Sequence, residues 1–568
     1  MTGKEGLPMR ITRRRTLLAM TTLTAATGLG ATTPPAAPKG PGFEHGVASG
    51  DPLTDRVILW TRLSGVDAPS DVQWQVAHDD AFTQIVAQGH FGTDTGRDYT
   101  VKVDVAGLTP ATDYVYRFRY GQVVSPTGRT RTLALQTDKV VLAAVSCSLH
   151  SNGYFNAYRA IADLDHIDAV VHLGDYIYEY GAGLTDYGMG NGRLLGRIPE
   201  PPHEIVTLSD YRTRHAQYKR DEDLQAAHAR APWICVFDDH EICNNPWKDG
   251  AENHTPPSKD GPGEGEWSVR KAVALKAYRE WMPIRDPAPG KLSEAIYRSF
   301  RFGNLAELIM IETRLLARSK QLDFSDLKMV DGRPDFDAFR TQLNDPQREL
   351  FGAEQRIWLN TTLQTSVRDG VRWQVLGNQV IMAKIAGPDL IKRFGPETVA
   401  SLMASLPDSA RSQLQTMIGL FSRPDPFPLN LDAWDGYPAE RERFYAMTKA
   451  AGARTIVLSG DSHTAWANEL HDAAGNQVAV ELGVTAITSP TRWLELPGLD
   501  LAQTLADQNE EVVAADDTNN GFVLVTLTPD EMIGEWKSVD TITSRQFRCT
   551  TQQRFVVKAS EGGATRFV

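Results

Sequence analysis

The sequence predicts a layered α/β domain preceded by a small all-β sandwich. Residues from about 43 to 135 form short alternating runs separated by Gly, Pro and Asp, which is typical of short strands. From about residue 139, apolar runs alternate with amphipathic helical segments, as in layered α/β domains. The chain has 568 residues, enough for one large core with attached modules. We therefore expect a sandwich over 43–135 and a large domain over 139–560.

Residues 1–38 have the features of an export signal. Four basic residues precede a mildly apolar segment of small residues: Arg10, Arg13, Arg14 and Arg15. The segment is too short and too rich in Thr to span a membrane stably. Residues 12–18, TRRRTLL, resemble the twin-arginine signal, although Thr16 stands where a bulky apolar residue is commoner. An ordinary secretory signal is the alternative. We expect a mature protein that is secreted, periplasmic or cell-wall associated and that meets the twin-arginine export machinery.

The charge and the cysteine content bear on the class of protein. Removal of residues 1–38, which carry a net charge of +4, changes the formal charge from −12 to −16. An acidic exported chain is a poor general binder of nucleic acid, so we expect no nucleic-acid partner. We also expect a monomer.

Four cysteines in so long a chain are too few for a disulfide framework, and the pairing of Cys235 with Cys243 stays open.

Within the N-terminal sandwich, residues 107–118 read GLTPATDYVYRF. This stretch resembles the fibronectin type III pattern, in which a Leu-Thr-Pro turn precedes a Tyr-rich strand. The resemblance implies a fibronectin-III-like sandwich. We expect it to serve as a spacer or a lid rather than as a separate binding domain.

Five apolar runs of the large domain end in side chains that bind metals or transfer protons. In chain order these side chains are Cys147, Asp175, Tyr178, Asp238, Asp239, His240, Asn378, Asp461 and His463. A lone Asp after Gly is usually a turn residue, and a lone Cys after a strand is usually a small hydrophobe. Five such strand ends together are hard to explain as unrelated turns. Because sites in layered α/β folds form at the carboxyl ends of strands, the pattern predicts a metal site.

The mixture of donors indicates which metals would bind. Tyrosinate and thiolate are anionic donors that favour an acidic ion such as ferric iron, and imidazole also suits iron. Carboxylate and amide oxygens suit calcium, magnesium or manganese. The combination suggests a hetero-metal cluster in which Asp175 bridges two ions. Such a cluster can clamp a phosphoryl oxygen and supply hydroxide near neutral pH.

The motifs are similar to those of a known family. GDYIY (174–178) has the GDxxY form of purple acid phosphatases. DDHE and GDSH stand where metallophosphoesterases have Gly-Asn-His-Glu/Asp and Gly-His-x-His. The combination resembles the PhoD-type alkaline phosphatases, which also carry a GVASGDP start (46–52 here), an SCS strand end, a preceding β-sandwich and a twin-arginine signal. The resemblance covers nearly the whole mature chain. It implies a metallophosphoesterase domain, a β-sheet sandwich flanked by helices.

The resemblance also implies a role for each motif residue. The ferric iron would be bound by Cys147, Asp175, Tyr178 and His463. Asp175 would bridge to calcium, which Asp239 and Asp461 would help to hold. Asn244 and Asn245 would join the calcium ligands or contact phosphate, and this choice stays open. His240 would give a proton or a hydrogen bond to the leaving group or the phosphate, and Glu241 would orient His240.

Two features leave their roles open. The family pattern leads us to expect Asp-Thr-Arg after the strand LAELIMI, but the chain has Glu312-Thr313-Arg314. The longer side chain puts the role of Glu312 in doubt, whereas Arg314 would contact the site or a core carboxylate. The insertion 386–430 is partly helical. It would serve as an apolar lid for lipid or pack on the core, and we favour packing.

These residues predict hydrolysis of a phosphate ester by direct attack of metal-bound hydroxide. No side-chain nucleophile is needed, and His240 would assist departure of the alcohol. We expect an alkaline phosphatase that acts on phosphomonoesters and phosphodiesters outside the cytoplasm. The alternative is a phospholipase D-like phosphodiesterase that acts on phospholipid headgroups. A non-catalytic binding protein on a phosphatase scaffold is a third hypothesis, which the retained ligands disfavour.

Overall fold

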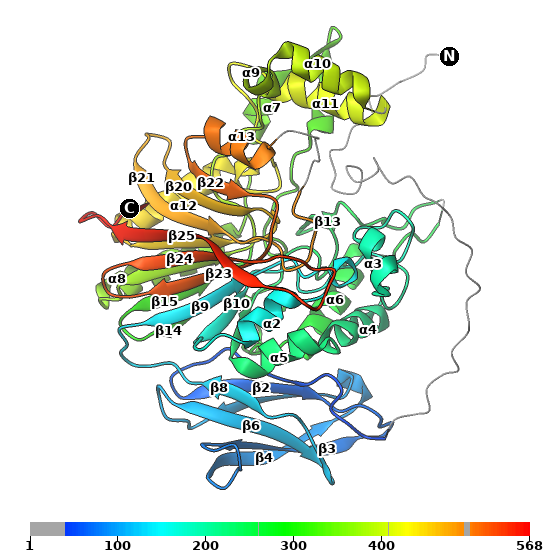
Figure 1. Cartoon of the computed structure of the whole chain (residues 1–568), viewed down its shortest axis with the longest axis vertical. Coiled ribbons are helices and arrows are strands. Elements are labelled where there is room, and N and C mark those ends of the chain that lie inside the picture. The colour runs from blue at the N-terminus through cyan, green and yellow to red at the C-terminus, as the bar shows by residue number, and fades with distance from the viewer. Residues whose placement is uncertain (1–39, 260, 407, 493–499) are drawn as a thin grey trace.

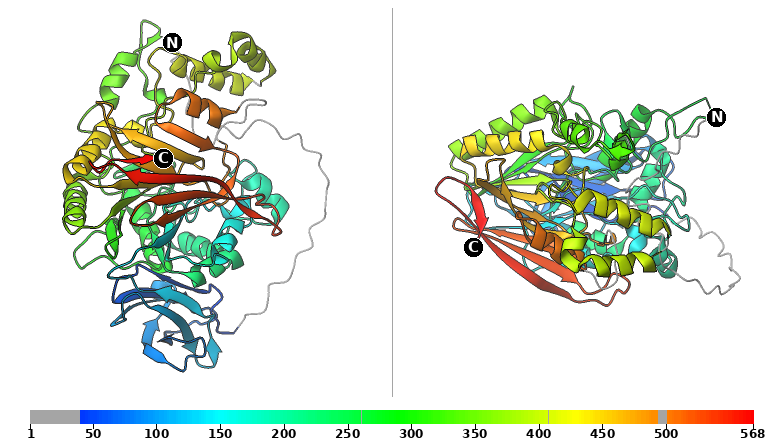
Figure 2. Two further views of the ribbon diagram at one scale, coloured as in Figure 1. Left: turned by 60° about the vertical axis from the view of Figure 1, so that its left-hand side comes forward. Right: turned by 90° about the horizontal axis from the view of Figure 1, so that it is seen from above.

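The computed structural model of the chain describes residues 40–259, 261–406, 408–492 and 500–568 (Figure 1). The predicted export signal over 1–38 lies outside the described residues. Two large β-sheets pack against each other, with helices on their outer faces. An all-β region lies at one end of the molecule and a small helical cap at the other (Figure 2). Mixed sheets flanked by helices, after an all-β region, agree with the predicted fold class. The fibronectin-III-like description stays a prediction.

The larger sheet has ten strands and unites both ends of the chain. In spatial order they are β26 (Thr565–Phe567), β25 (Cys549–Ala559), β24 (Met532–Val539), β23 (Asn520–Leu527), β9 (Val140–Val145), β10 (Ala169–His172), β11 (Trp233–Cys235), β1 (Val47–Gly50), β2 (Arg56–Arg62) and β5 (Thr100–Ala106). Strands β9, β10 and β11 are parallel, so their carboxyl ends meet at one edge.

The second sheet has seven strands. In spatial order they are β14 (Arg298–Phe302), β15 (Ala306–Met310), β18 (Trp373–Asn378), β19 (Thr455–Ser459), β21 (Gln477–Gly483), β20 (Ala465–His471) and β22 (Val512–Asp516). Strands β15, β18, β19 and β21 are parallel. The sheet therefore also gathers carboxyl ends at one edge.

The central strands of this second sheet bury both faces. In β19, Ile456 and Leu458 join the core shared with the larger sheet, whereas Val457 faces a second core. Successive side chains of a strand point to opposite faces. A strand covered on both faces therefore reads as a continuous apolar run, as TIVLS does.

Helices cover the two outer faces of the sheets (Figure 1). The ten-stranded sheet packs against α2 (Asn156–Ala162), α4 (Leu208–Lys219), α5 (Glu222–Arg230) and α6 (Trp267–Trp281). The seven-stranded sheet packs against α8 (Gly352–Arg368) and α12 (Pro438–Ala451). The second core contains Leu359 of α8 and Phe444 of α12, both fully buried.

The N-terminal strands are divided between two sheets. A five-stranded sheet contains β4 (Ile85–Thr93), β3 (Ser70–Ala77), β6 (Asp113–Tyr120), β7 (Val123–Val124) and β8 (Gly128–Arg131). The opposing strands β1, β2 and β5 continue the ten-stranded sheet, because β1 pairs with β11 in parallel. At this junction a Cβ on Gly50 would lie 2.1 Å from the Pro283 carbonyl oxygen, so only glycine fits.

The segment 386–430 forms most of the helical cap. It contains α9 (Leu390–Phe394), α10 (Pro396–Ser405) and α11 (Asp408–Phe421). Its apolar side chains pack mainly against α7 (Phe336–Leu343) and α13 (Leu501–Gln508), in two small clusters separate from the main cores. The insertion thus buries its apolar faces within the cap rather than presenting them as an open lipid-binding surface.

None of the four cysteines forms a disulfide: Cys147, Cys235, Cys243 and Cys549. This answers the question that the sequence left open for Cys235 and Cys243. In the part of the chain that the structure describes, no helix combines the length and apolarity that a membrane span requires.

Candidate metal centre

The side chains that the sequence predicted to converge follow strands of both sheets. Cys147 comes after β9, Asp175 after β10 and Asp239 after β11, all in the ten-stranded sheet. Asp461 and His463 come after β19 of the seven-stranded sheet. The cluster therefore lies where the carboxyl ends of the two sheets meet, the usual place for a site in a layered α/β fold.

Three overlapping sets of potential ligand atoms form this cluster. In the mixed-donor set, the ligand atoms lie within 4.8 Å of one another: Cys147, Asp175 and His463. In the carboxylate set, the same limit of 4.8 Å holds for four residues: Asp175, Asp238, Asp239 and Asp461. A third set joins Asp175 and Asp239 to His240. Asp175 belongs to every set, and a carboxylate has two oxygens, so Asp175 is placed to bridge two ions.

Tyr178 belongs with the mixed-donor set. Its hydroxyl donates to Oδ2 of Asp175 at 2.9 Å and lies 3.3 Å from Nε2 of His463. The hydroxyl of Ser489 donates to the Tyr178 oxygen at 2.8 Å. The phenol oxygen thus stands beside the carboxylate and the imidazole, as the GDxxY spacing predicted, and Ser489 holds it in place.

The orientation of His463 leaves one ring nitrogen facing the cluster. Its Nδ1 lies 2.8 Å from the carbonyl oxygen of Pro490 and 3.1 Å from the hydroxyl of Tyr187. A carbonyl oxygen only accepts hydrogen bonds, so the contact with Pro490 places the proton on Nδ1. Nε2 is then the ring nitrogen that faces Tyr178 and the other ligand atoms, and in the neutral tautomer with the proton on Nδ1 it can bind a metal.

The backbone of the cluster is held in an uncommon conformation. Five predicted site residues have positive φ angles: Cys147 (61°), Asp175 (58°), Asn245 (50°), Asp461 (62°) and His463 (62°). Such angles are rare in residues other than glycine and concentrate at functional sites. Gly174 has φ 117°, and a Cβ there would lie 2.2 Å from that of Asp238. Glycine is therefore required immediately before Asp175.

Several buried carboxylate oxygens of the cluster lack hydrogen-bond donors. They are Oδ1 of Asp175, Oδ2 of Asp238 and Oδ1 of Asp239. Burial and the charge of Asp239 raise the pKa of Asp175 well above its ordinary value. A buried carboxylate without a partner is costly, and these oxygens converge on one place. The residues therefore fit bound cations, and the mixed-donor set adds the thiol, phenol and imidazole that suit a transition metal.

Arg314 is the cationic side chain that the structure places against the carboxylate set. Its Nε donates to Oδ1 of Asp238 at 2.5 Å, and its Nη1 donates to Oδ2 of Asp432 at 2.6 Å. Its Nη2 lies 3.8 Å from Oδ1 of Asp461. The guanidinium is completely buried and always charged. It therefore balances part of the negative charge and holds Asp238 and Asp432 in position.

Glu312 stabilises the loop that carries Arg314. Its carboxylate accepts from the backbone amides of Arg314, Leu315 and Leu316 at 2.7, 2.6 and 3.0 Å. These amides follow the end of β15 and would otherwise lack acceptors. The departure from the family pattern at this position thus has a structural explanation, and Glu312 acts on the site through the loop.

His240 is held by Glu179. Its Nδ1 lies 2.7 Å from Oε2 of Glu179, its ring stacks on Tyr178 with 4.2 Å between centroids, and its Nε2 lies 3.7 Å from Asp239. Burial lowers the pKa of His240, but the charges of Asp239 and Glu179 outweigh burial and raise the pKa well above 6.5. Its Nε2 lies on the side of the carboxylates.

The expected role of Glu241 is wrong. Its carboxylate accepts from the backbone amides of Asp175, Tyr176 and Asp238 at 3.1, 2.6 and 2.9 Å. These amides belong to loops that follow two neighbouring strands, and Glu241 is the acceptor that satisfies them. It therefore positions the loops, and Glu179 orients His240. The sequence contained one signal for Glu179, because it directly follows Tyr178 in GDYIYEYG.

Asn244 and Asn245 lie beside the carboxylate set. The backbone amide of Asn245 donates to Oδ2 of Asp239 at 3.0 Å. Both side-chain amides donate to Oε2 of Glu252, at 3.3 Å for Asn244 and 2.8 Å for Asn245. Both residues also line a hollow next to the cluster. Their geometry is compatible with either role that the sequence left open.

Two residues differ from the sequence reasoning. Asn378 is bonded elsewhere: its Nδ2 donates to the hydroxyl of Ser459 at 3.0 Å, and its Oδ1 accepts from the Trp434 indole at 3.1 Å. It therefore ties β18 to β19 rather than adding to the cluster. Asp238, which the sequence placed among the strand-end donors but the resemblance did not assign as a ligand, lies in the carboxylate set. Its position directly before Asp239 was the available signal.

Known proteins resemble this chain along most of its length. A family model described as "PhoD-like phosphatase" matches residues 142–536, and one described as "PhoD-like phosphatase, N-terminal domain" matches residues 29–134. Alkaline phosphatase D of Bacillus subtilis (strain 168) is 34% identical over 539 residues, which are 92% of this chain and 82% of that protein. A solved structure of PhoD has a TM-score of 0.74 and 30% identity, with 95% of this chain and 93% of that chain covered. The first match contains every residue of the two ligand sets.

Proposed function

The chain belongs to the PhoD-like phosphatase family and is a phosphatase, and we propose that it is an exported phosphate-ester hydrolase whose cluster would hold ferric iron and calcium. One observation carries the metal proposal. Two sets of ligand atoms, different in chemistry, share the carboxylate of Asp175. A shared carboxylate between unlike donor sets is suited to two unlike ions.

Each donor set favours a different ion. We assign ferric iron to Cys147, Asp175, Tyr178 and His463, because thiolate, phenolate and imidazole favour a transition metal. We assign calcium to the carboxylate set, in which Asp175, Asp239 and Asp461 supply oxygens, because calcium prefers oxygen ligands. Asp238 is less available, since Arg314 binds one of its two oxygens.

In this proposal the bound ions supply Lewis acidity to the phosphoryl group and activate water. The chain itself contributes a proton and fixed charge. His240 donates a proton from Nε2 to the oxygen of the departing alcohol. Glu179 accepts from Nδ1 at 2.7 Å, which keeps the ring in one orientation and stabilises its charged form. Arg314 offsets the carboxylate charge that would otherwise repel the phosphate.

The substrate classes are phosphomonoesters and phosphodiesters. The proposal is tested with the full chain loaded with iron and calcium, and metal content is measured on the same sample. Three substrates are compared: p-nitrophenyl phosphate, bis-p-nitrophenyl phosphate and phosphatidylcholine. We expect turnover of the first two. Release of choline from the lipid alone would favour a phospholipase D, and no turnover with both metals bound would overturn the proposal in favour of a binding protein.

We also propose export by the twin-arginine pathway, which suits a protein that acquires metals before export. The motif in residues 12–18 supports it. Replacement of Arg13 and Arg14 by lysine is expected to retain the precursor inside the cell, as measured by the fraction of chain recovered outside the cytoplasm. Unchanged export of this variant would favour an ordinary secretory signal.

A further inference from the structure

A hollow of about 200 Å³ with one apolar wall opens beside the candidate metal centre, and its other lining is polar and includes Asn430, Asp435 and Arg492. We propose that this hollow binds one ring-sized apolar substituent of a phosphodiester, and this inference rests on the proposed function. Its apolar wall comes from Ile381, Ala383, Ile385, Leu429 and Trp466. The subsite would make the protein selective for diesters that carry an aromatic group.

The hollow is continuous with the metal ligands. Asp461 and His463 line it together with Asn245. A substrate whose phosphorus lies at the cluster can therefore extend one ester substituent into the hollow. A monoester has no such second substituent, so occupation of the hollow would distinguish diesters from monoesters.

The walls of the hollow are firmly held. Ile381, Ala383 and Trp466 belong to the second core. The indole nitrogen of Trp466 donates to the hydroxyl of Ser462 at 3.0 Å, so the ring is free to offer apolar contact without leaving a polar atom unsatisfied. The backbone amide of Ala383 donates to Glu481 at 3.0 Å. A preformed apolar wall binds a ring without the cost of ordering the site.

The helical insertion begins and ends at this wall. The backbone amide of Leu429 donates to the carbonyl of Ile385 at 2.7 Å, and Gly387 donates to Phe427 at 3.0 Å. These bonds pair the two stems of the insertion, and the pair presents Ile385 and Leu429 to the hollow. The insertion thus contributes to the site through its base, while its helices pack within the cap.

The size of the hollow indicates which substituent fits. A cavity of about 150 Å³ lined by Leu, Ile and Phe accommodates benzene, so about 200 Å³ accommodates one aromatic ring. Two acyl chains of a phospholipid are far larger. The volume of this hollow therefore fits an aryl or heteroaryl substituent.

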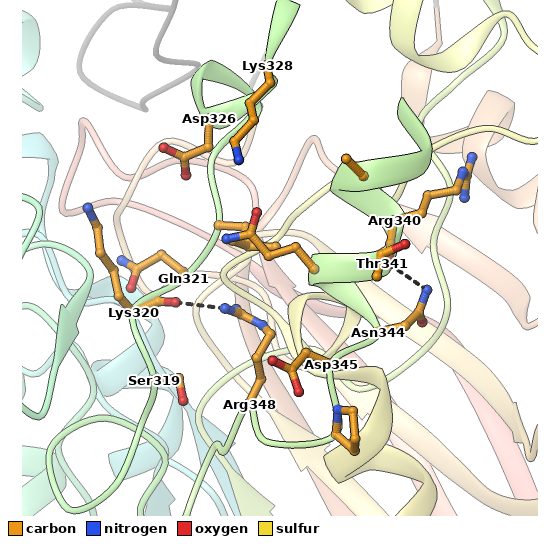
Figure 3. A pocket seen from close by; sticks show the side chains of 14 residues that line it. Ser319, Lys320, Gln321, Asp326, Lys328, Arg340, Thr341, Asn344, Asp345 and Arg348 are labelled. Carbon is orange, nitrogen blue, oxygen red and sulfur yellow. Dashed lines mark hydrogen bonds between the residues drawn. The ribbon is translucent and has the colours of Figure 1, made fainter. Parts of the chain in front are cut away.

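A larger hollow, of about 1330 Å³, does not compete for this role (Figure 3). None of the ligand residues lines it. Two of its charged side chains bind backbone carbonyls, since Arg348 donates to that of Lys320 at 3.1 Å and Arg340 to that of Asp425 at 2.5 Å. Without a ligand residue in its lining, this hollow gives a phosphoryl group no metal site to bind.

The test compares two diesters with the same leaving group. Methyl p-nitrophenyl phosphate and phenyl p-nitrophenyl phosphate both release p-nitrophenolate, so they differ in the substituent that stays on phosphorus. With the metal-loaded full chain, we expect kcat/KM to be at least about tenfold higher for the phenyl ester. Calorimetric titration with phenylphosphonate and methylphosphonate is a second measurement, and we expect the phenyl compound to bind at least about tenfold more tightly.

Two variants distinguish the effect of filling the hollow from the general effect of adding a tryptophan to the cap cluster. Leu429→Trp fills the hollow and is expected to reduce the phenyl-to-methyl ratio at least fivefold, to about 2 or less, because about one ring of volume is lost. Leu327→Trp is the matched control. Leu327 is also a half-buried leucine packed against the same cap cluster but lines neither hollow, so its ratio should equal that of the wild type.

The outcomes distinguish this inference from the proposed function. A high phenyl-to-methyl ratio that Leu429→Trp alone reduces supports the subsite. Turnover of p-nitrophenyl phosphate and of both diesters with a ratio near one would overturn the subsite and leave the proposed function standing. No turnover of any ester with both metals bound would overturn the proposed function and, with it, the inference.

Discussion

Two buried polar regions are built on adjacent residues of the same loop, and they differ in sign. Asp175 belongs to the acidic cluster, whose oxygens converge without donors. Tyr176, the next residue, bonds at 2.9 Å to His228, which also contacts the ammonium of Lys219 at 3.0 Å. We call this second region the basic network. Both regions are fully buried, so burial alone does not identify a functional site.

The difference lies in how each region tolerates burial. In the basic network, burial lowers the pKa of Lys219 to about 7 and that of the neighbouring His172 to about 3, which favours the uncharged form of both bases. In the acidic cluster, burial raises the pKa of Asp175 and of Asp238 instead. Their oxygens still lack donors. Among the described residues, the acidic cluster is the candidate metal centre because several carboxylate oxygens converge there without donors.

The largest effect is expected from Asp175→Asn. An amide supplies one oxygen and no charge, so neither ion keeps its shared ligand. We expect activity on bis-p-nitrophenyl phosphate to fall by about 1000-fold or more, with loss of both metals from the purified protein. Tyr176→Phe is the matched control on the basic side of the loop and should retain both metals. Retention of both metals by Asp175→Asn would contradict the shared site.

Arg314→Met tests the internal charge balance of the acidic cluster. The change leaves Asp238 and Asp432 buried without their cation, which is expected to lower the free energy of unfolding by about 3–5 kcal/mol. Urea denaturation of the metal-free protein measures this change. Arg368→Met is the control, because Arg368 forms an exposed pair with Asp369 and should be nearly neutral. Equal effects of the two changes would show that the buried guanidinium is not needed.

Substitutions in the mixed-donor set and in the carboxylate set should each remove a different metal. Cys147→Ser removes the thiolate and is expected to weaken binding of the transition metal by at least about 10- to 100-fold, with calcium retained. Asp461→Asn should weaken binding of calcium, with the transition metal retained. Metal analysis after dialysis measures both. Loss of the same ion from both variants would mean that the two donor sets hold one ion.

The smallest effect concerns the basic network and pH. Lys219 has a pKa of about 7 in the folded protein and about 10.4 when unfolded. Between these values the unfolded chain binds more protons, so stability rises with pH. From pH 7 to 8.5 this adds about 1–2 kcal/mol to the free energy of unfolding, and Lys219→Met should remove that rise. Parallel pH curves for wild type and Lys219→Met would contradict a neutral buried lysine.

Much of the fold and of the site could be predicted locally. Alternating runs predicted the strands of the N-terminal region, and apolar runs predicted those of the large domain. The side chains of Cys147, Asp175, Asp239 and Asp461 could be read as strand-end donors because parallel strands gather their carboxyl ends. Side-chain direction could not be read in this way. Glu241 and Glu179 are both glutamates close to motif residues, and only the three-dimensional path of the loops decides which one reaches His240.

The sequence alone determined the order of the strands along the chain, the residues at their ends and the kinds of donor atom that those residues carry. These features depend on periodicity and on covalent spacing. Only the tertiary structure decided that β1 joins the sheet of β11, that Arg314 meets Asp238 across 76 positions, and that the stems of the insertion line a hollow beside the cluster. Such contacts join segments far apart in the chain. They follow from how the two sheets pack and from which buried groups need partners, and neither is encoded in any one segment.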